Sequence, residues 1–246
     1  MTRAARAALF WVSAAAIAAG LLWSGLALPR IGTADHPYGS RAVAASLARR
    51  TANAVSSVNF DQRALDTLGE ESILFAAVLG SVVLLRQVRG ERRTHARAGY
   101  VLPATRLLGL GLAPVTAVTG VYVVAHGALT PGGGFQGGVV LATGLHVAYV
   151  ALDYRALRRV RPLAVLEVAE ALAAGAFAAL GLLGFTAAAG SYLRNVLPLG
   201  TFNDLVSAGL VPAFNTAVGV EVASGISVVL SQFLFQAVEM EETDGA

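Results

Sequence analysis

Long apolar runs alternate with short polar intervals along most of this chain. Counted with their small flanking residues, six runs approach the about 20 residues that a helix needs to cross a hydrocarbon core about 30 Å thick. These runs cover residues 7–28, 73–85, 107–124, 139–152, 163–183 and 218–235. The pattern predicts an all-α integral membrane protein with about six transmembrane helices.

Two interpretations fit the first run, a retained helix and a secretory signal peptide. Arg3 and Arg6 precede the run, and Trp11 and Trp23 lie toward its two ends, as tryptophans do at membrane interfaces. Small residues near the end of the run resemble a cleavage site, but the run exceeds the usual signal core of about 7–15 residues. We therefore expect a retained transmembrane helix.

Arginines concentrate in the intervals 86–97 and 153–161, which follow the second and fourth runs. The positive-inside rule places such intervals in the cytoplasm, which predicts that both termini are cytoplasmic. The first polar interval also carries arginines, but it is long and partly neutralised by acids. This topology places three polar intervals together on the outer side: residues 61–71, 126–138 and 191–215.

Composition supports a membrane protein and excludes several classes of function. Of the 246 residues, 56% are hydrophobic and only 13% are charged, whereas soluble domains carry about 25% charged residues. The net charge of +3 comes with no aromatic-plus-basic stripe, so no nucleic-acid partner is expected. The absence of cysteine excludes thiolate metal sites and iron–sulfur ligation. With no nucleotide loop, zinc motif or nucleophile elbow, we expect no enzyme activity, cofactor or bound metal.

A helical face is predicted between the first two runs. From Arg41 onward, Val43, Leu47, Ala54 and Val58 recur at spacings of four and seven residues. This spacing predicts one helix that lies either on the membrane surface or packed on the protein.

Four carboxylates and one arginine precede the second run. Thr67 followed by Glu70 forms a capping box, which predicts a helix start near Thr67. Capping and pairing with Arg63 is one interpretation of these acids. The other is an outward-facing entry site for a cation or a proton, because ionisable groups at membrane depth are costly and are functional candidates. The acids are Asp61, Asp66, Glu70 and Glu71.

A glycine-rich interval separates the third and fourth runs. Pro131 prevents an unbroken helix, and glycines allow another backbone to come close. The interval either packs tightly against a helix of a neighbouring subunit or lines a hydrated cavity with free carbonyls, His126 and Gln136. The helix-break and packing motif consists of Pro131, Gly132, Gly133, Gly134, Phe135, Gly137 and Gly138.

Three further acids lie within the last two runs. Glu167 and Glu170 share a helical face about one turn into the fifth run. They either pair with the arginines of 158–161 or form a cytoplasmic exit for a proton or cation. Glu221, near the outer start of the last run, is either a first-turn acid or a pathway residue.

Two stretches resemble known families. Residues 126–138 resemble the signature of the MnhB/MrpB subunit of multisubunit Na⁺/H⁺ antiporters, and the resemblance extends over about 101–237 through 207–212 and 215–222. That family commonly has a second histidine where this chain has Ala128, so no histidine pair is expected. Residues 59–61 and 66–70 resemble the C-terminal end of the large MrpA subunit, which is similar to the MbhE component of membrane-bound hydrogenases.

The resemblances imply a fusion. Residues 1–95 would be the MrpA-tail part with two transmembrane helices, and residues 96–246 the MrpB part with four.

The resemblance also implies a membrane location, a transport reaction and partner subunits. The family forms a bacterial plasma-membrane complex that exchanges Na⁺, or another monovalent cation, for H⁺ across the lipid bilayer. Its other subunits are MrpA-, MrpC-, MrpD-, MrpE-, MrpF- and MrpG-like. Buried lysines are central to the proton paths of its large subunits, and this chain has no lysine. We therefore expect a small subunit that contributes to assembly and to the cation or proton path. The alternatives are a subunit of a hydrogenase-like respiratory complex and a purely structural scaffold.

Overall fold

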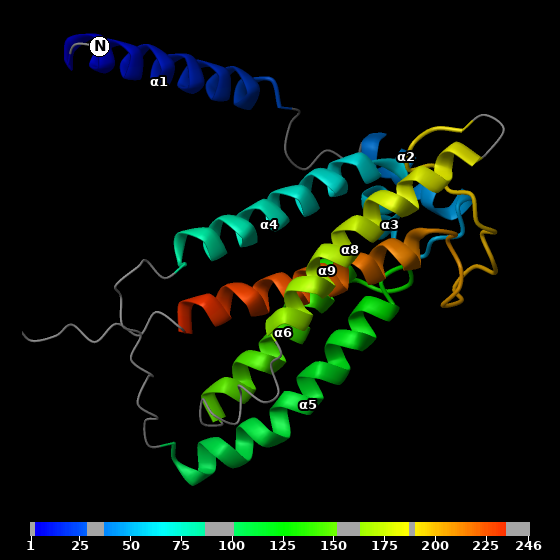
Figure 1. Cartoon of the computed structure of the whole chain (residues 1–246). Helices are drawn as coiled ribbons and strands as arrows, with labels where there is room; N and C mark the ends of the chain where they lie inside the picture. Colours follow the sequence, from blue (N-terminus) through cyan, green and yellow to red (C-terminus); the bar gives the residue numbers. More distant parts are fainter. Residues whose placement is uncertain (1–2, 29–36, 87–100, 152–162, 187–189, 235–246) are drawn as a thin grey trace, which may run out of the picture. The chain divides into compact units, whose positions relative to one another are not determined.

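The computed structural model describes residues 3–28, 37–86, 101–151, 163–186 and 190–234 (Figure 1). The chain divides into two compact units, Met1–Ser40 and Arg41–Ala246. The first unit contains α1, Arg3–Leu26, a 24-residue apolar helix in which no residue is buried. Its length and hydropathy are sufficient to cross a membrane, as the first apolar run predicts.

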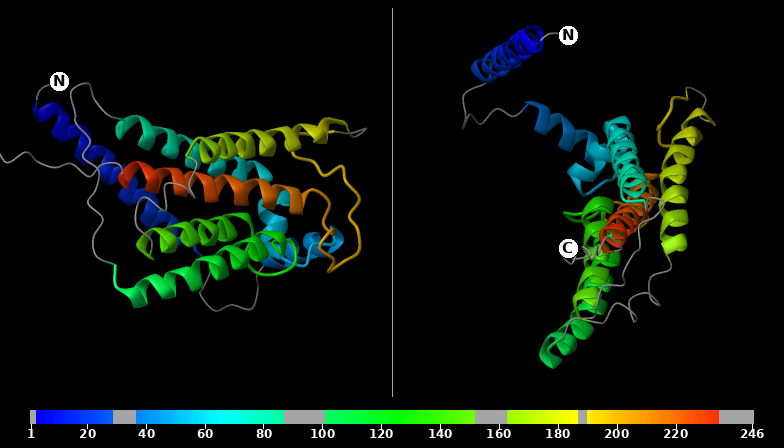
Figure 2. Two further views of the ribbon diagram at one scale, coloured as in Figure 1. Left: turned by 60° about the horizontal axis from the view of Figure 1, so that its bottom comes forward. Right: turned by 60° about the vertical axis from the view of Figure 1, so that its left-hand side comes forward.

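The second unit is a bundle around one central helix. The helices are α4 (Ala64–Leu84), α5 (Pro103–Ala125), α6 (Gly134–Ala151), α8 (Leu163–Leu182) and α9 (Val211–Leu234). Helix α9 contacts all four others, and Figure 2 shows it between them. In the apolar stretch of α9, 61% of the residues are buried, whereas the share is 17% in each of α4, α5 and α8. The outer helices therefore present most of their apolar side chains away from the bundle.

Small residues set the closest helix contact, between α5 and α6. A Cβ added to Gly120 would come 2.6 Å from Leu141 Cγ, and one added to Gly137 would come 2.4 Å from Val124 Cγ2. At the other end of the pair, a Cβ on Gly109 would come 2.0 Å from Ala151 Cβ. Because contacts of this kind let helices approach closely without hydrophobic driving force, they suit packing in lipid.

The all-α membrane class is confirmed, since every regular element in the described ranges is helical. Five described helices are long and apolar enough to cross a membrane: α1, α4, α5, α9, and α8 together with the short 3₁₀ helix η2, Leu183–Thr186. The predicted run 139–152 is α6, which begins earlier, at Gly134, and is not among these five. The cytoplasmic orientation of the termini remains a prediction, and the intervals 87–97 and 153–161 lie outside the described residues.

The single helix predicted from Arg41 to Val58 is wrong. Helix α2, Pro37–Ala48, ends before Arg50, which has a φ of 56°. The chain then restarts at α3, Ala54–Ser57, because Asn53 Oδ1 accepts from the backbone N–H groups of Val55 and Ser56. An asparagine at this position is a strong helix start, and the spacing of apolar residues could not reveal it.

The predicted helix start near Thr67 is also wrong. A short π-helix, η1 (Val58–Gln62), leads across Arg63 directly into α4, which begins at Ala64. Thr67 therefore lies inside the helix, where its Oγ1 donates to the carbonyl of Asn59 at 2.7 Å. Asp66 is the acid of the first turn, a position that the helix dipole favours.

Candidate functional site

The glycine-rich interval is held from one side by Asn53, at the start of α3. Asn53 Nδ2 donates to the carbonyls of Gly127 and Thr130, each at 2.8 Å. The Asn53 N–H donates to the carbonyl of Ala128 at 3.0 Å. Three carbonyls of the interval are thus bound by one buried residue from the first predicted part of the chain.

Asn215, on α9, holds the interval from the other side. Its Oδ1 accepts from the N–H of Gly134 at 2.8 Å, and its Nδ2 donates to Ser56 Oγ and to the carbonyl of Val211, both at 3.0 Å. Asn215 is fully buried. A Cβ on Gly133 would come 2.6 Å from Asn215 Oδ1, and the φ of Gly133 is 138°, so this position suits glycine on both counts.

The close packing expected against a neighbouring subunit is therefore made with this chain's own helices. The backbone of Gly134 lies against Asn215 and Val218 of α9. Gln136 points to the exposed side, and His126 is partly exposed, with its ring stacked on Tyr122 at 3.9 Å between centroids. The structure does not bring these two side chains to the buried acids described below.

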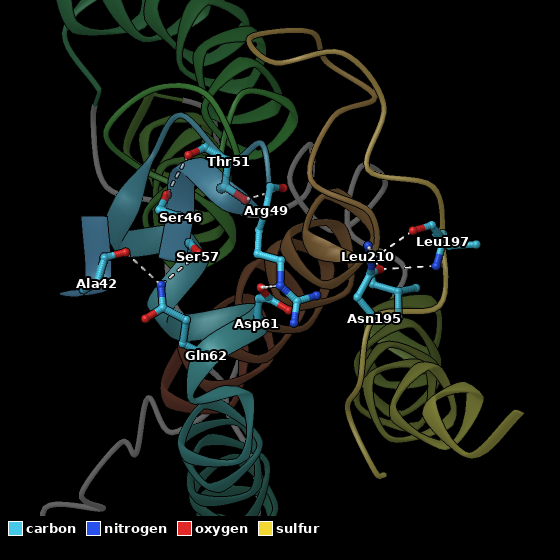
Figure 3. A network of polar contacts seen from close by, with 10 residues as sticks. All are labelled: Ala42, Ser46, Arg49, Thr51, Ser57, Asp61, Gln62, Asn195, Leu197 and Leu210. Atoms are coloured by element: carbon cyan, nitrogen blue, oxygen red, sulfur yellow. Dashed lines mark hydrogen bonds and ion pairs between the residues drawn. The ribbon is translucent and has the colours of Figure 1, made fainter. Parts of the chain in front are cut away.

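A polar network lies at the same end of the bundle (Figure 3). Arg49 Nε lies 3.5 Å from Asp61 Oδ2. Gln62 Nε2 donates to the carbonyl of Ala42 and to Ser57 Oγ, both at 3.1 Å. Asp61 is only 10% exposed, and this burial raises the pKa of its carboxyl above the ordinary 3.8, while the positive charge of Arg49 partly lowers it.

The segment 190–210 lies at this end of the bundle as well. Arg50 Nη1 donates to the carbonyl of Gly200, and Asn195 Oδ1 accepts from the N–H groups of Leu197 and Leu210. Gly134 bonds to Asn215, and Asp61 pairs with Arg49 next to Arg50, so the three intervals that the topology places on one side meet at this end. Which side of the membrane they face remains a prediction.

Three of the predicted acids lie on the surface of this chain. Asp66 is about half exposed and pairs with Arg63 one turn earlier. Glu70 and Glu167 are also exposed. Because these side chains point away from the bundle, any role on a pathway would involve lipid headgroups or other subunits.

Three further predicted acids, besides Asp61, are buried inside the helical spans. Glu71 on α4 is 2% exposed, Glu170 on α8 is 4% exposed and Glu221 on α9 is 0% exposed. Carboxyl groups buried in this way are rare and costly within a membrane. Glu71 faces the bundle while its neighbour Glu70 is exposed, because consecutive residues of a helix point about 100° apart.

These three carboxyl groups come together where α4, α8 and α9 meet. Glu71 and Glu221 lie close enough to interact, and Glu170 interacts with Glu221. The carboxyl of Glu170 lies over Gly225, one turn from Glu221 along α9. Both carboxyl oxygens of Glu71 and of Glu221, and Oε1 of Glu170, have no hydrogen-bond partner within the described residues.

An aromatic cluster separates these acids from the glycine-rich end. Phe177 and Phe214, both fully buried, have ring centroids 4.5 Å apart, and Phe60 stacks on Phe214 at 6.3 Å. Phe177 follows Glu170, and Phe214 precedes Glu221, by seven residues, or about 10 Å along each helix. The three rings therefore lie between the buried acids and the glycine-rich end.

The sequence indicated each buried acid separately and could not show that they meet. The roles of Asn53 and Asn215 were also missed. Asn215 lies just before the predicted apolar run 218–235 and in the stretch 215–222 of the family resemblance, which was the available signal. Asn53 had no such signal, because its partners are 74 and 77 residues away.

Comparison with known proteins places the chain in a family. The family described as "Domain related to MnhB subunit of Na+/H+ antiporter" matches residues 104–228. An uncharacterised protein of Methanocaldococcus jannaschii is 30% identical over 200 residues, which cover 71% of this chain and 74% of that protein.

Two solved structures share the fold. A chain of the membrane-bound sulfane sulfur reductase, an archaeal respiratory membrane complex, matches with a TM-score of 0.68 and 28% identity, over 92% of this chain and 97% of that one. A chain of the Mrp complex from a Dietzia species matches with a TM-score of 0.68 and 23% identity. That match covers 98% of this chain but only 27% of the longer Dietzia chain.

The matched residues 104–228 contain α5, the glycine-rich interval, α6, α8 and most of α9, and so include Glu170, Glu221 and Asn215. This all-α membrane protein therefore belongs to the family of domains related to the MnhB subunit of Na⁺/H⁺ antiporters.

Proposed function

We propose that this chain is a membrane subunit of a multisubunit monovalent cation (Na⁺)/proton antiporter, in which it supports assembly and contributes buried acids to the ion path. The observation that carries this proposal is the meeting of Glu71, Glu170 and Glu221 inside an otherwise apolar bundle. Ionisable groups at such depth mark ion and proton pathways more often than they mark structural contacts. The family description supplies the class of transport.

The partners are the other Mrp-type subunits, MrpA-, MrpC-, MrpD-, MrpE-, MrpF- and MrpG-like. Support comes from the exposed apolar side chains of α4, α5 and α8, which lipid or neighbouring helices must cover. The setting is a bacterial plasma membrane, with both termini in the cytoplasm. The division at residues 95 and 96 into an MrpA-tail part and an MrpB part belongs to the same proposal.

A respiratory complex is the second candidate. It is favoured by the match to nearly the whole length of one chain of the sulfane sulfur reductase complex. In that case the same bundle would occupy the membrane arm of a redox enzyme. Purification of the native complex separates the two candidates, because subunits with metal clusters would copurify only in the respiratory case.

The antiporter proposal predicts a growth phenotype. A strain that lacks the gene should become sensitive to Na⁺ or to alkaline medium, and the intact gene should restore tolerance. Normal growth of the deletion strain under both stresses would contradict the proposal.

Substitutions of the two exposed acids of α4 test whether the chain is only a structural scaffold. Asp66→Asn and Glu70→Gln each remove a charge without altering the buried contacts of the helix. If these acids face the ion path, both variants should assemble into the complex and lose antiport. If the buried-acid variants described below also transport normally, the chain is a scaffold.

A further inference from the structure

We infer that Glu71, Glu221 and Glu170 form a line of carboxyl groups that holds protons inside this chain, that Glu71 and Glu221 share one proton, and that the line does not bind the transported metal cation. This inference deepens the proposed function and rests on it for the biological role. The protonation itself can be measured without transport.

The carboxyl groups of Glu71 and Glu221 are buried and lack hydrogen-bond partners among the described residues. Glu71 is 2% exposed and Glu221 is 0% exposed. Within the described part of the chain, the charged groups that act on the three acids are Glu70 on α4, Glu167 on α8 and the three acids themselves, all of them acidic. Two ionised carboxylates here would carry a large desolvation cost, and no described residue supplies a counter-charge.

A shared proton removes this difficulty. When one carboxyl is protonated, its O–H donates to a carboxylate oxygen of the other, so one charge disappears and one hydrogen bond forms. Pairs of like carboxyl groups at close range commonly hold one proton between them. The meeting of α4 and α9 at Glu71 and Glu221 provides the close approach that such a pair requires.

The arrangement of the three carboxyl groups suits protons rather than a metal cation. A hard cation needs several oxygen ligands that converge on one point. Here the third carboxyl lies over Gly225, displaced from Glu221 by one turn, or about 6 Å along α9. Among the described residues, no three His, Cys, Asp or Glu side chains are grouped so that they could hold a metal ion. An extended line of carboxyl groups suits the passing of protons better than the binding of Na⁺.

The line also contains polar side chains that could pass protons. Ser224 is buried next to Gly225, and Ser227 and Ser231 continue along the buried side of α9. Ser227 Oγ and Ser231 Oγ each donate to the carbonyl four residues earlier, at 2.6 Å, and keep lone pairs that can accept a proton. The aromatic cluster of Phe60, Phe177 and Phe214 lies on the other side of the acids along α9.

The experiment is infrared difference spectroscopy on the purified complete complex, in NaCl and in choline chloride of equal concentration. Spectra of the wild type are compared with those of Glu71→Gln/Glu221→Gln, and Asp204→Asn, an exposed acid of the segment 190–210, is the control. We expect the wild type to show a protonated-carboxyl band that the double variant lacks and Asp204→Asn retains. Na⁺ should leave this band unchanged at fixed pH.

Two results would overturn the inference: a loss of the band on addition of Na⁺ at fixed pH, or no difference in the band between wild type and double variant. If the double variant fails to assemble, the single variants replace it. Each keeps one carboxyl and supplies an amide N–H in place of the shared proton. The remaining carboxyl is then ionised, so the protonated-carboxyl band should disappear, and a band unchanged from the wild type would overturn the inference.

The proposed function and the protonation of the carboxyl line can be contradicted independently of each other. If the band behaves as expected but all variants transport normally, the proton line exists and is not on the antiport path. If antiport is absent from the wild-type complex altogether, the proposed function is wrong while the spectra still decide the protonation.

Discussion

The carboxyl group of Glu170 on α8 lies directly against Gly225 on α9. A Cβ added at Gly225 would come 3.1 Å from Glu170 Oε1 and 3.0 Å from Val78 Cγ2 on α4. The missing side chain thus allows three helices to meet at the point where Glu170 approaches Glu221. Close approach through a small residue is here combined with a buried acid, which links the packing of the bundle to its electrostatics.

Gly225→Ala should disturb this meeting point. The added methyl group must displace either Val78 or the Glu170 carboxyl by a few tenths of an ångström, and overpacking of this kind costs on the order of 1–3 kcal/mol. We expect a lower thermal unfolding temperature of the purified complex, together with slower transport. Gly175→Ala on α8 is the matched control, because nothing lies within 4 Å of its added Cβ. Equal unfolding temperatures for the two variants would contradict the packing argument.

Asn215→Ala should destabilise the glycine-rich end. It leaves the N–H of Gly134 without its acceptor and Ser56 Oγ without its donor. A buried polar group that loses its partner costs about 1–3 kcal/mol. Asn215→Asp should be at least as harmful, because a carboxylate cannot donate to Ser56 or to the carbonyl of Val211.

The neighbouring residue provides the control for Asn215. Thr216→Val removes an exposed hydroxyl that bonds only to the carbonyl of Pro212 in its own helix. Thermal unfolding followed by size-exclusion chromatography compares the variants. An Asn215→Ala complex as stable as Thr216→Val would show that the asparagine is not a structural clamp.

Gly134→Ala tests the contact between the glycine-rich interval and α9. Its Cβ would come 2.5 Å from the backbone oxygen of Asn215 and 2.6 Å from Val218 Cβ, so the helices would have to separate. We expect loss of the folded chain from membranes, measured by immunoblot. Gly111→Ala on α5 meets no atom within 4 Å and should accumulate normally, since alanine is the better helix former. Normal accumulation of Gly134→Ala would mean that this contact is not required.

Asp61 should make stability depend on pH. Burial raises its folded-state pKa above 3.8, so the folded chain binds this proton more tightly than the unfolded chain does. The free energy of unfolding must then fall as pH rises from about 3.8 through the raised value, because the unfolded state holds fewer protons. Asp61→Asn lacks this proton, so its stability relative to wild type should increase over the same interval. A stability difference between Asp61→Asn and the wild type that does not change with pH would contradict the raised pKa of Asp61.

The sequence predicted the positions of the long helices well, because each apolar run falls on a helix; α6 alone of these six is not among the described helices of membrane-crossing length and hydropathy. The prediction failed where local hydrogen bonds set the ends of helices. Asn53 begins a new helix, α3, and Thr67 lies inside α4 rather than at its start. The sequence also could not separate Glu70 from Glu71. Adjacent residues of a helix point about 100° apart, so which one faces the bundle depends on how α4 packs on α9. The meeting of Glu71, Glu170 and Glu221 depends on the same packing, and no spacing in the sequence specifies it.

The comparison of Glu221→Gln with Asp204→Asn tests the account most directly. Glu221 is fully buried on the central helix, whereas Asp204 is exposed in the segment 190–210. Each variant loses one carboxyl group. Na⁺-driven proton movement would be measured in inverted membrane vesicles that contain the complete complex, after assembly has been confirmed by copurification. We predict that Glu221→Gln assembles and loses most of its antiport, while Asp204→Asn transports at the wild-type rate. A fully assembled Glu221→Gln complex that transports like the wild type would contradict the claim that this buried carboxyl lies on the proton path.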